Sequence, residues 1–140
     1  MPASSVDPPR VVHRHPVRVY WEDTDAGGVV FYANYLKFFE RARTEWLRTL
    51  GYSQEAMRHD QGVMFVVTDT ATRYLQPARL DDLLEVTVAV QAARAASMVI
   101  VQQALRNGTL LAEGEIRIGC VDARTFRPQR IPKELFQELE

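Results

Sequence analysis

The sequence predicts an α+β domain in which one long helix packs against an antiparallel sheet. Its apolar residues follow a helical period from Asn34 to about Leu50, and after Gly62 they alternate as they do in strands. The connections between the later strands are short, which makes neighbouring strands antiparallel. Asn107-Gly108 marks one of these connections, because this dipeptide favours a two-residue hairpin turn.

The chain begins with a polar, proline-rich stretch that predicts a flexible leader over residues 1–14. Residues 15–140 are then expected to form a single domain, because the chain of 140 residues suits one domain and no linker interrupts it. The alternation in Val17–Trp21 predicts the first strand, which leads directly into an acidic loop.

The long helix is expected to lie at the centre of the domain because its apolar stripe is wide. Asn34 is predicted to be its N-cap and Gly51 its C-terminal stop. Arg43 falls within the stripe, so it either pairs with Glu40, one turn earlier, or extends its charged head to solvent. The stripe itself consists of Tyr35, Phe39, Ala42, Trp46 and Leu50, widened by Leu36 and Leu47.

Four strands are predicted after Gly62, with short helices on either side. The strands are expected in "VMFVVTDTATRYL", "DLLEVTVAV", "SMVIVQQAL" and "TLLAEGEIRIGCVDA", and the helices over Ser53–His59 and after Pro132. Alternate residues from Leu110 to Cys120 share one face of the last strand. Cys120 is therefore predicted to be a small core residue.

Composition and charge exclude several classes of protein. A hydrophobic content of 46% and a charged content of 25% are ordinary for a folded domain. The net charge of −1 provides no basic surface for nucleic acid or an anionic membrane. A single cysteine cannot form an intramolecular disulfide or a cysteine-rich zinc site. No apolar run reaches the roughly 20 residues of a membrane span and no secretory signal is present, so a cytoplasmic protein without an integral membrane segment is expected.

The acidic loop "EDTDAGG" that follows the first strand is the strongest functional signal in the chain. Its simplest interpretation is a turn between strand and helix, since Asp, Thr and Gly are common turn residues. A calcium loop fits at Asp23, Asp25 and Gly28, but Gly27 and Asn34 stand where an EF-hand needs further oxygen ligands. We therefore predict no metal ion here.

A third interpretation places a catalytic carboxylate beside the start of the helix. The exposed N–H groups and the positive dipole of a helix N-terminus attract a carbonyl oxygen that gains negative charge. Asp25 could attack such a carbonyl or deprotonate a water molecule that does so. Gly27 and Gly28 would allow backbone and ligand to approach closely. Glu40 is a second candidate acid, ranked below Asp25 because it lies further into the helix.

The three histidines, His13, His15 and His59, are expected at the surface. None lies near the helix start in the sequence, so no Ser-His-Asp or Cys-His arrangement is predicted. The same observation argues against a dehydratase, which would pair a histidine with an acid.

The stretch "YWEDTDAGGVVFYANYLKFFERARTEWL", Tyr20–Leu47, closely resembles the signature of the hotdog-fold acyl-CoA thioesterases of the 4-hydroxybenzoyl-CoA thioesterase type. It looks most similar to their bacterial Tol–Pal-associated, YbgC-type subgroup. The likeness continues through "TRYLQPARLDDLLEV" and "CVDARTFRPQRIP", so it covers about Val17–Pro132. It implies the hotdog fold, a long central helix wrapped by a five-stranded antiparallel β-sheet. It also implies a homodimer or tetramer with active sites at the subunit interface.

By this resemblance the second aspartate, Asp25, carries catalysis, and the backbone N–H of Tyr32 polarises the thioester carbonyl. Members of the YbgC-type subgroup often carry His where this chain has Tyr32, and the departure leaves the backbone contact unaffected. The substrate-binding residues that the resemblance implies near the helix start are Gly28, Val29, Asn34 and Tyr35.

The implied substrate is an acyl-CoA or an acyl group on an acyl carrier protein, with no cofactor. Val66, Val67 and Thr68 of a partner subunit are expected to form the facing wall of the acyl pocket. Arg94, between the third and fourth strands, is the candidate for binding the coenzyme A phosphates. The expected protein is a cytoplasmic, homo-oligomeric thioesterase of lipid metabolism. The alternative is a non-catalytic acyl-CoA or acyl-carrier-protein binder with the same fold.

Overall fold

The structure is a computed structural model that describes residues 8–140, so residues 1–7 of the predicted leader lie outside it. Its elements are β1 (Val11–Arg18), the 3-10 turn η1 (Trp21–Asp23), α1 (Asn34–Thr49), α2 (Gln54–Asp60), β2 (Val63–Tyr74), β3 (Leu83–Ala93), β4 (Ser97–Arg106), β5 (Thr109–Asp122) and α3 (Lys133–Leu139). The strand order is β1-β3-β4-β5-β2, and all neighbours are antiparallel. The predicted α+β class with a five-stranded antiparallel sheet is confirmed.

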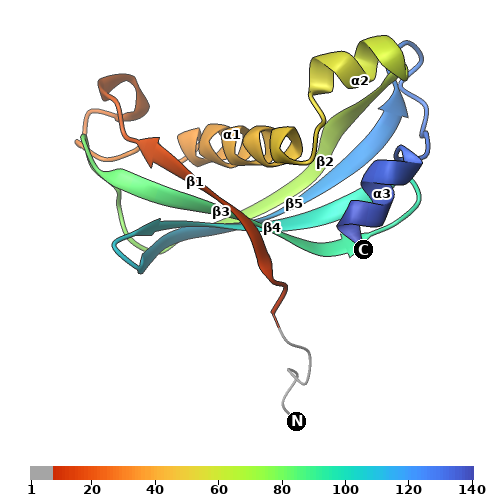
Figure 1. The fold of residues 1–140 in the computed structure, drawn as a ribbon. Coiled ribbons are helices and arrows are strands. Elements are labelled where there is room, and N and C mark those ends of the chain that lie inside the picture. Colours follow the sequence, from red (N-terminus) through yellow and green to blue (C-terminus); the bar gives the residue numbers. More distant parts are fainter. Residues whose placement is uncertain (1–7) are drawn as a thin grey trace.

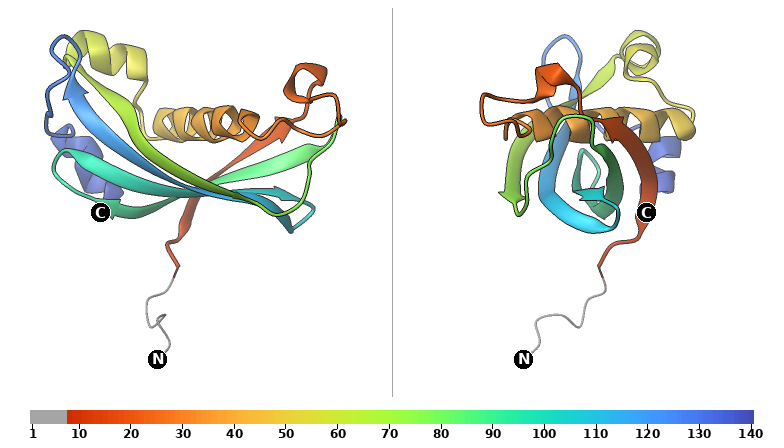
Figure 2. Two further views of the ribbon diagram at one scale, coloured as in Figure 1. Left: turned by 180° about the vertical axis from the view of Figure 1, so that it is seen from behind. Right: turned by 90° about the vertical axis from the view of Figure 1, so that its left-hand side faces the viewer.

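The sheet curves around α1, which lies against its concave face (Figures 1 and 2). Helices α2 and α3 lie at one end of the sheet, and the connection from β1 to α1 lies at the other (Figure 1). Strands β1 and β2 are the two edges, so each has one side without a strand partner within the described chain. No helix within residues 8–140 is long and apolar enough to cross a bilayer.

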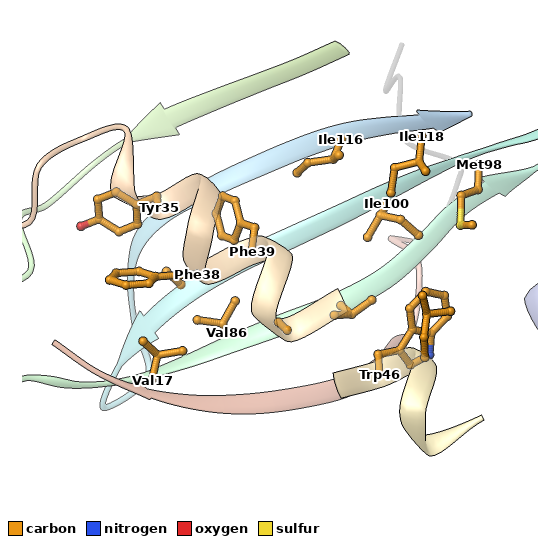
Figure 3. Close-up of a cluster of buried hydrophobic side chains, with 14 of the residues drawn as sticks. Val17, Tyr35, Phe38, Phe39, Trp46, Val86, Met98, Ile100, Ile116 and Ile118 are labelled. Carbon is orange, nitrogen blue, oxygen red and sulfur yellow. The ribbon is translucent and has the colours of Figure 1, made fainter. Parts of the chain in front are cut away.

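The core lies between the buried face of α1 and the inner face of the sheet (Figure 3). The helix contributes Phe38, Phe39 and Trp46, which pack over buried strand residues such as Val86, Ile100 and Ile116. Gly114 of β5 leaves room for the helix, because a Cβ there would lie 2.8 Å from Cε2 of Phe39. The close approach of α1 to β5 therefore depends on a missing side chain.

Cys120 is buried on β5, as predicted. Burial raises the pKa of its thiol to about 11, so the thiol stays protonated at neutral pH. A protonated, buried thiol is a poor nucleophile, and Cys120 therefore serves packing.

The C-terminal end of α1 was predicted correctly, and its N-terminal end was not. Gly51 has a φ of +89°, and its N–H donates to the carbonyl of Arg48 at 3.0 Å. Tyr52 N–H donates to Leu47 O at 2.9 Å, which completes a Schellman motif and confirms Gly51 as the stop. The predicted N-cap is wrong, because Asn34 is itself the first residue of the helix.

Strand β1 begins at Val11 and ends at Arg18, whereas the prediction was Val17–Trp21. Residues 11–14 of the predicted leader are therefore part of the sheet, where β1 pairs with β3. Proline is tolerated at Pro16 because β1 is an edge strand, one side of which makes no ladder. The prolines before and within this stretch led to the prediction of a flexible leader in place of a strand.

The prediction that His13 and His15 lie at the surface is wrong. Both are half-buried and alternate with exposed neighbours along β1, and their ring centroids lie 6.2 Å apart. His13 Nε2 is buried and has no hydrogen-bond partner within residues 8–140. Burial, followed by the charge of His15, lowers the pKa of His13, and the carboxylate of Glu45 on α1 opposes this change. His13 therefore lies close enough to α1 for its charge to interact with that of Glu45.

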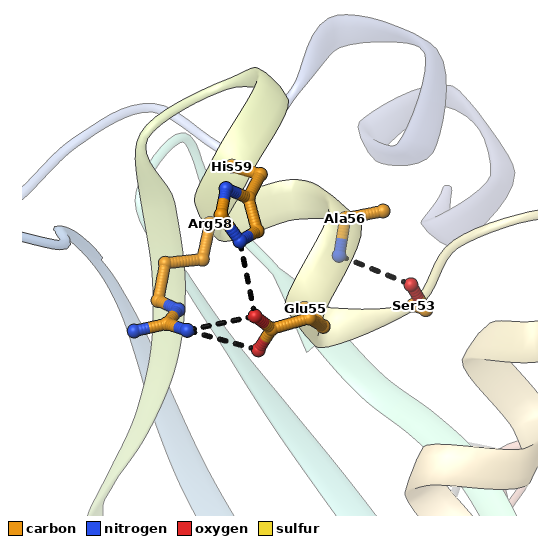
Figure 4. A network of polar contacts seen from close by, with 5 residues as sticks. All are labelled: Ser53, Glu55, Ala56, Arg58 and His59. Carbon is orange, nitrogen blue, oxygen red and sulfur yellow. Dashed lines mark hydrogen bonds and ion pairs between the residues drawn. The ribbon is translucent and has the colours of Figure 1, made fainter.

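Helix α2 is a short surface helix that precedes β2 (Figure 4). Ser53 caps it by accepting a hydrogen bond from Ala56 N–H at 3.1 Å. Glu55 forms an ion pair with Arg58 at 2.8 Å, and His59 Nε2 lies 3.2 Å from Glu55 Oε1. The predicted surface position of His59 is confirmed.

Candidate active site

The acidic loop connects β1 to α1 at one end of the sheet, where the β2–β3 connection also lies (Figure 2). Val30 N–H donates to Ala78 O at 2.8 Å, and Val29 pairs with Arg79 in an isolated antiparallel bridge. Two successive residues of the loop are thereby held against the β2–β3 connection. The loop's backbone is consequently anchored by residues that lie far along the chain.

Asp23 is the structural acid of the loop, and only 3% of it is exposed. Its Oδ2 accepts a hydrogen bond from Tyr20 N–H, and its Oδ1 accepts one from Nδ2 of Asn34, each at 2.7 Å. Its backbone carbonyl accepts a third from Phe31 N–H at 2.9 Å. Asp23 therefore ties the end of β1 to the first residue of α1. Asn34 uses its amide in this bond, which explains why it does not cap the helix.

Asp25 has the opposite environment, because it is exposed to solvent. Its Oδ1 accepts a hydrogen bond from Gly27 N–H at 2.8 Å, and its Oδ2 meets no protein donor within residues 8–140. Gly28 reverses the loop with a φ of +79°, and its N–H donates to Asp25 O at 3.0 Å. The bond to Oδ1 thus fixes the orientation of the Asp25 side chain, and Oδ2 stays available to bind a ligand or water.

The Asp25 carboxylate lies at a pocket of about 510 Å³, whose lining residues are Trp21, Thr24, Asp25, Ala26, Gly28 and Leu80. Trp21 is 81% exposed and Leu80 is 40% exposed, so neither belongs to the core. Sequence reasoning missed both residues. A tryptophan at the end of a strand and a leucine in a turn carry no functional signal until the fold brings them beside an acid.

The start of α1 provides unpaired backbone donors. Asn34 N–H donates to Phe31 O at 2.8 Å, whereas Tyr32 N–H and Ala33 N–H have no acceptor within the described residues. The Tyr32 side chain is 62% exposed, and its ring meets that of Tyr74 edge to face, with 5.9 Å between centroids. The N–H of Tyr32 is therefore free to bind an oxygen atom of a ligand.

A second pocket of about 250 Å³ is lined by Val29, the residue after Gly28, and by Tyr32 at the start of the helix. Tyrosine rings form part of its wall, with the centroids of Tyr35 and Tyr74 5.6 Å apart. Burial raises the pKa of the Tyr35 hydroxyl, which is therefore neutral at physiological pH. Three of the predicted binding residues, Gly28, Val29 and Tyr35, thus line the two pockets.

Three other predicted binding residues lie elsewhere in the chain. Val67 and Thr68 are exposed on the edge strand β2, where Thr68 Oγ1 donates to Asp69 Oδ2 at 3.0 Å. Arg94 is exposed in the turn after β3. Strand β3 begins at the end of the sheet that holds Asp25, and its 11 residues make it about 35 Å long. Figure 1 shows these two ends on opposite sides of the molecule. A single chain therefore does not bring these side chains to Asp25.

Arg43 does not form the ion pair with Glu40 that was one of two predicted alternatives. Within the described residues its side-chain partner is Gln102, whose Oε1 accepts a hydrogen bond from Nη1 at 2.9 Å. Burial lowers the pKa of Arg43, and the nearby carboxylate of Glu40 opposes this change. Sequence reasoning missed Gln102, because a glutamine within an alternating strand gives no sign that it will lie buried beneath a helix.

The loop and the helix start together suit an attack on a carbonyl group. An oxygen bound by Tyr32 N–H would lie at the positive end of the helix dipole, which stabilises negative charge that develops there. The free oxygen of Asp25 is suited to act as a nucleophile or as a general base toward water. Among residues 8–140, no three His, Cys, Asp or Glu side chains lie close enough together to hold a metal ion.

Several known proteins that resemble this chain are thioesterases. The family model described as the thioesterase-like superfamily matches residues 19–139. Acyl-CoA thioesterase YbgC of Haemophilus influenzae is 47% identical over 120 residues, which cover 86% of this chain and 88% of that protein. Acyl-CoA thioester hydrolase YbgC of Escherichia coli is 45% identical over 128 residues, which cover 91% of this chain and 95% of that protein. The crystal structure of a probable thioesterase from Bartonella henselae matches with a TM-score of 0.83 and 32% identity, over 86% of this chain and 98% of that one.

Proposed function

The chain belongs to the thioesterase-like superfamily, and from this premise we propose that Asp25 is the acid with which it cleaves its substrate. The enzyme is an acyl-CoA thioesterase, which hydrolyses the thioester of an acyl-CoA to a free carboxylic acid and coenzyme A. Relatives named for this reaction share 45% and 47% identity with it over most of both chains. Its fold is the hotdog fold of the thioesterases that it matches in structure.

One contrast between two neighbouring acids supports the assignment to Asp25. Asp23 is buried and both of its carboxylate oxygens accept hydrogen bonds from the protein. Asp25 is exposed at a pocket and keeps one oxygen free of protein donors within the described residues. The free N–H of Tyr32 belongs to the same loop-to-helix segment. In this proposal a reacting carbonyl meets both the acid and the oxygen-binding donor of this segment.

In the proposed reaction the carbonyl oxygen of the thioester accepts a hydrogen bond from Tyr32 N–H. By the first route, the Asp25 carboxylate attacks the carbonyl carbon and the thiolate of coenzyme A leaves and takes up a proton. Water then hydrolyses the mixed anhydride and regenerates the carboxylate. By the second route, Asp25 removes a proton from a water molecule that attacks the same carbon, and the proton passes to the leaving thiolate. Both routes use the same two groups and give the same products.

We place the complete site between two copies of the chain. Strand β2 has 12 residues and no strand partner on its outer side within the described chain, and Val67 on it is 51% exposed. Antiparallel pairing of two β2 strands would close this edge and join two sheets. It would also bring Val67 and Thr68 of one copy toward the acyl group bound by the other. In a dimer or a homotetramer, Arg94 of another copy is the candidate for the coenzyme A phosphates.

The biological setting is part of the same proposal. We place the enzyme in the cytoplasm and in lipid metabolism, where acyl-CoA thioesters are formed and consumed. An acyl group carried by an acyl carrier protein is the second form of substrate to test.

The decisive experiment measures thiol release from a panel of acyl-CoA thioesters by the wild type and by Asp25→Asn. We expect kcat to fall by about a thousandfold in the variant, because the amide can neither attack nor accept the proton. The melting temperature and the oligomer should stay unchanged, because Asp25 is exposed. Glu22→Gln is the matched control, since it removes a charge from an exposed acid of the same loop.

Two results would contradict the proposal. Thiol release by Asp25→Asn at the wild-type rate would show that another group carries the reaction. Binding of acyl-CoA by the wild type with no thiol release would instead favour a non-catalytic binder with this fold.

A further inference from the structure

Arg43 is a half-buried cation whose position is fixed by a buried amide. Gln102 on β4 is only 1% exposed, and its Nε2 donates to Phe39 O at 3.0 Å and to Thr87 O at 3.2 Å. Both bonds orient the amide so that Oε1 faces the helix, where it accepts the bond from Arg43 Nη1 at 2.9 Å. The guanidinium is therefore held between α1 and the sheet and is not a freely extended surface group.

Most of the N–H donors of this guanidinium have no acceptor within residues 8–140. A guanidinium has five N–H donors, and within residues 8–140 the bond to neutral Gln102 is the one that Arg43 makes through its side chain. Glu40 influences its charge but forms no ion pair with it in the described chain, and Glu40 itself is exposed. A half-buried cation without a paired anion is unfavourable, so this position is complementary to an anionic group.

The guanidinium opens onto a pocket that the proposed function already involves. The pocket has a volume of about 160 Å³ and is lined by Arg43, Glu40, Gln54 and apolar residues that include Phe65, Val67 and Ile118. Val67 is one of the three residues, with Val66 and Thr68, that are expected to form the facing wall of the acyl site. The copy of the chain that contributes Val67 therefore also carries Arg43 at the same pocket.

We propose that Arg43 binds the far end of the acyl group and selects acyl-CoA substrates whose acyl chain ends in a carboxylate. This inference rests on the proposed function, since it assigns the acyl part of that substrate. A carboxylate accepts two parallel hydrogen bonds from a guanidinium, whereas a methyl end would leave the same donors without an acceptor from the substrate. Such an unpaired polar group is what allows a site to discriminate strongly between two substrates.

The test compares matched pairs of acyl-CoA thioesters of equal chain length, such as adipyl-CoA with hexanoyl-CoA and glutaryl-CoA with pentanoyl-CoA. We expect the wild type to show a kcat/KM about tenfold or more higher for the carboxylate-ended member of at least one pair. Arg43→Met should remove this preference and still release thiol from hexanoyl-CoA. Arg43→Lys should keep part of it, and Glu40→Gln should strengthen it, because a competing negative charge is removed.

The wild-type measurement alone decides the proposal if a variant fails to fold. A wild type that prefers the methyl-ended member of every pair would overturn it. Equal losses for both members in Arg43→Met would also overturn it, because they would show that Arg43 only links α1 to the sheet. Loss of the oligomer in that variant by size-exclusion chromatography would assign the guanidinium to a contact between copies, again overturning the proposal. Absence of thiol release from every thioester would overturn the proposed function, and this inference with it.

Discussion

The two ends of α1 are built in opposite ways. At the C-terminal end, Gly51 and Tyr52 donate hydrogen bonds to carbonyls of the last turn at 3.0 and 2.9 Å. At the N-terminal end, Ala33 precedes the helix without a side-chain cap, and Tyr32 N–H has no acceptor within the described residues. A helix end normally has its free groups satisfied by caps or by water, and Ser, Thr, Asp or Asn is favoured at the N-cap. The N-terminal end of α1 therefore lacks the side-chain cap that a Ser, Thr, Asp or Asn in place of Ala33 would provide.

The two ends of α1 therefore differ in how far their backbone groups are satisfied by hydrogen bonds within the chain. At the C-terminal end of α1, Gly51 and Tyr52 satisfy carbonyls of the last turn with hydrogen bonds from within the chain. The N-terminal end of α1 follows the loop that carries Asp25, and within the described residues its Tyr32 N–H has no acceptor. The neighbouring acids show the same division, because Asp23 is fully engaged by the protein and Asp25 is not.

Asp23→Ala should have the largest effect on folding of the changes that probe this contrast. It would leave the N–H of Tyr20 and the amide of Asn34 without their acceptor in a buried setting. We expect the free energy of unfolding to fall by about 3 kcal/mol, measured by urea denaturation. Activity should fall as well, because the loop would lose its tie to the helix.

Asp25→Ala is the matched variant for Asp23→Ala. It removes an exposed carboxylate whose one protein bond comes from the neighbouring Gly27 within the described residues. Its stability should stay within about 0.5 kcal/mol of the wild type, while its activity is lost. If both variants lost stability equally, the division between a structural and a functional acid would be wrong.

Gly51→Ala should have a smaller effect and should act on stability alone. Gly51 has a φ of +89°, a conformation that a residue with a Cβ adopts only with strain. We expect the free energy of unfolding to fall by about 1 kcal/mol, with kcat/KM for acyl-CoA unchanged at room temperature. A loss of activity without a loss of stability would show that the C-terminal end of α1 also takes part in the reaction.

One part of the pH dependence of stability should come from His13, on strand β1. Burial lowers the pKa of His13 below its ordinary value of 6.5, with His15 adding to the shift and Glu45 opposing it. The folded state therefore binds fewer protons at His13 than the unfolded state, and stability should fall as the pH drops below about 6.5. Urea unfolding of the wild type and of His13→Gln at about pH 7.5 and 5.5 checks this. An identical pH dependence in both proteins would contradict it.

Much of the fold could be predicted because its signals are local. The apolar period of α1, the stop at Gly51 and the alternation of the later strands each depend on residues within a few positions of one another. Strand β1 was misplaced because prolines suggested a leader, and only its position at the edge of the sheet explains why Pro16 is tolerated. His13 and His15 were misplaced for the same reason, since they lie on that strand.

The sequence by itself determined the order of the elements, the long helix and the acidic loop before it, together with the likeness to a family of thioesterases. The resemblance assigned catalysis to Asp25 and left Asp23 as its structural neighbour, but the hydrogen bonds and burial that separate the two acids could not be read from the sequence. Only the tertiary structure decided that Asn34 binds Asp23, 11 residues away, and that Gln102 holds Arg43, 59 residues away. The physical reason is that burial and hydrogen bonding depend on which distant segments come into contact, whereas periodicity and turn chemistry depend on near neighbours.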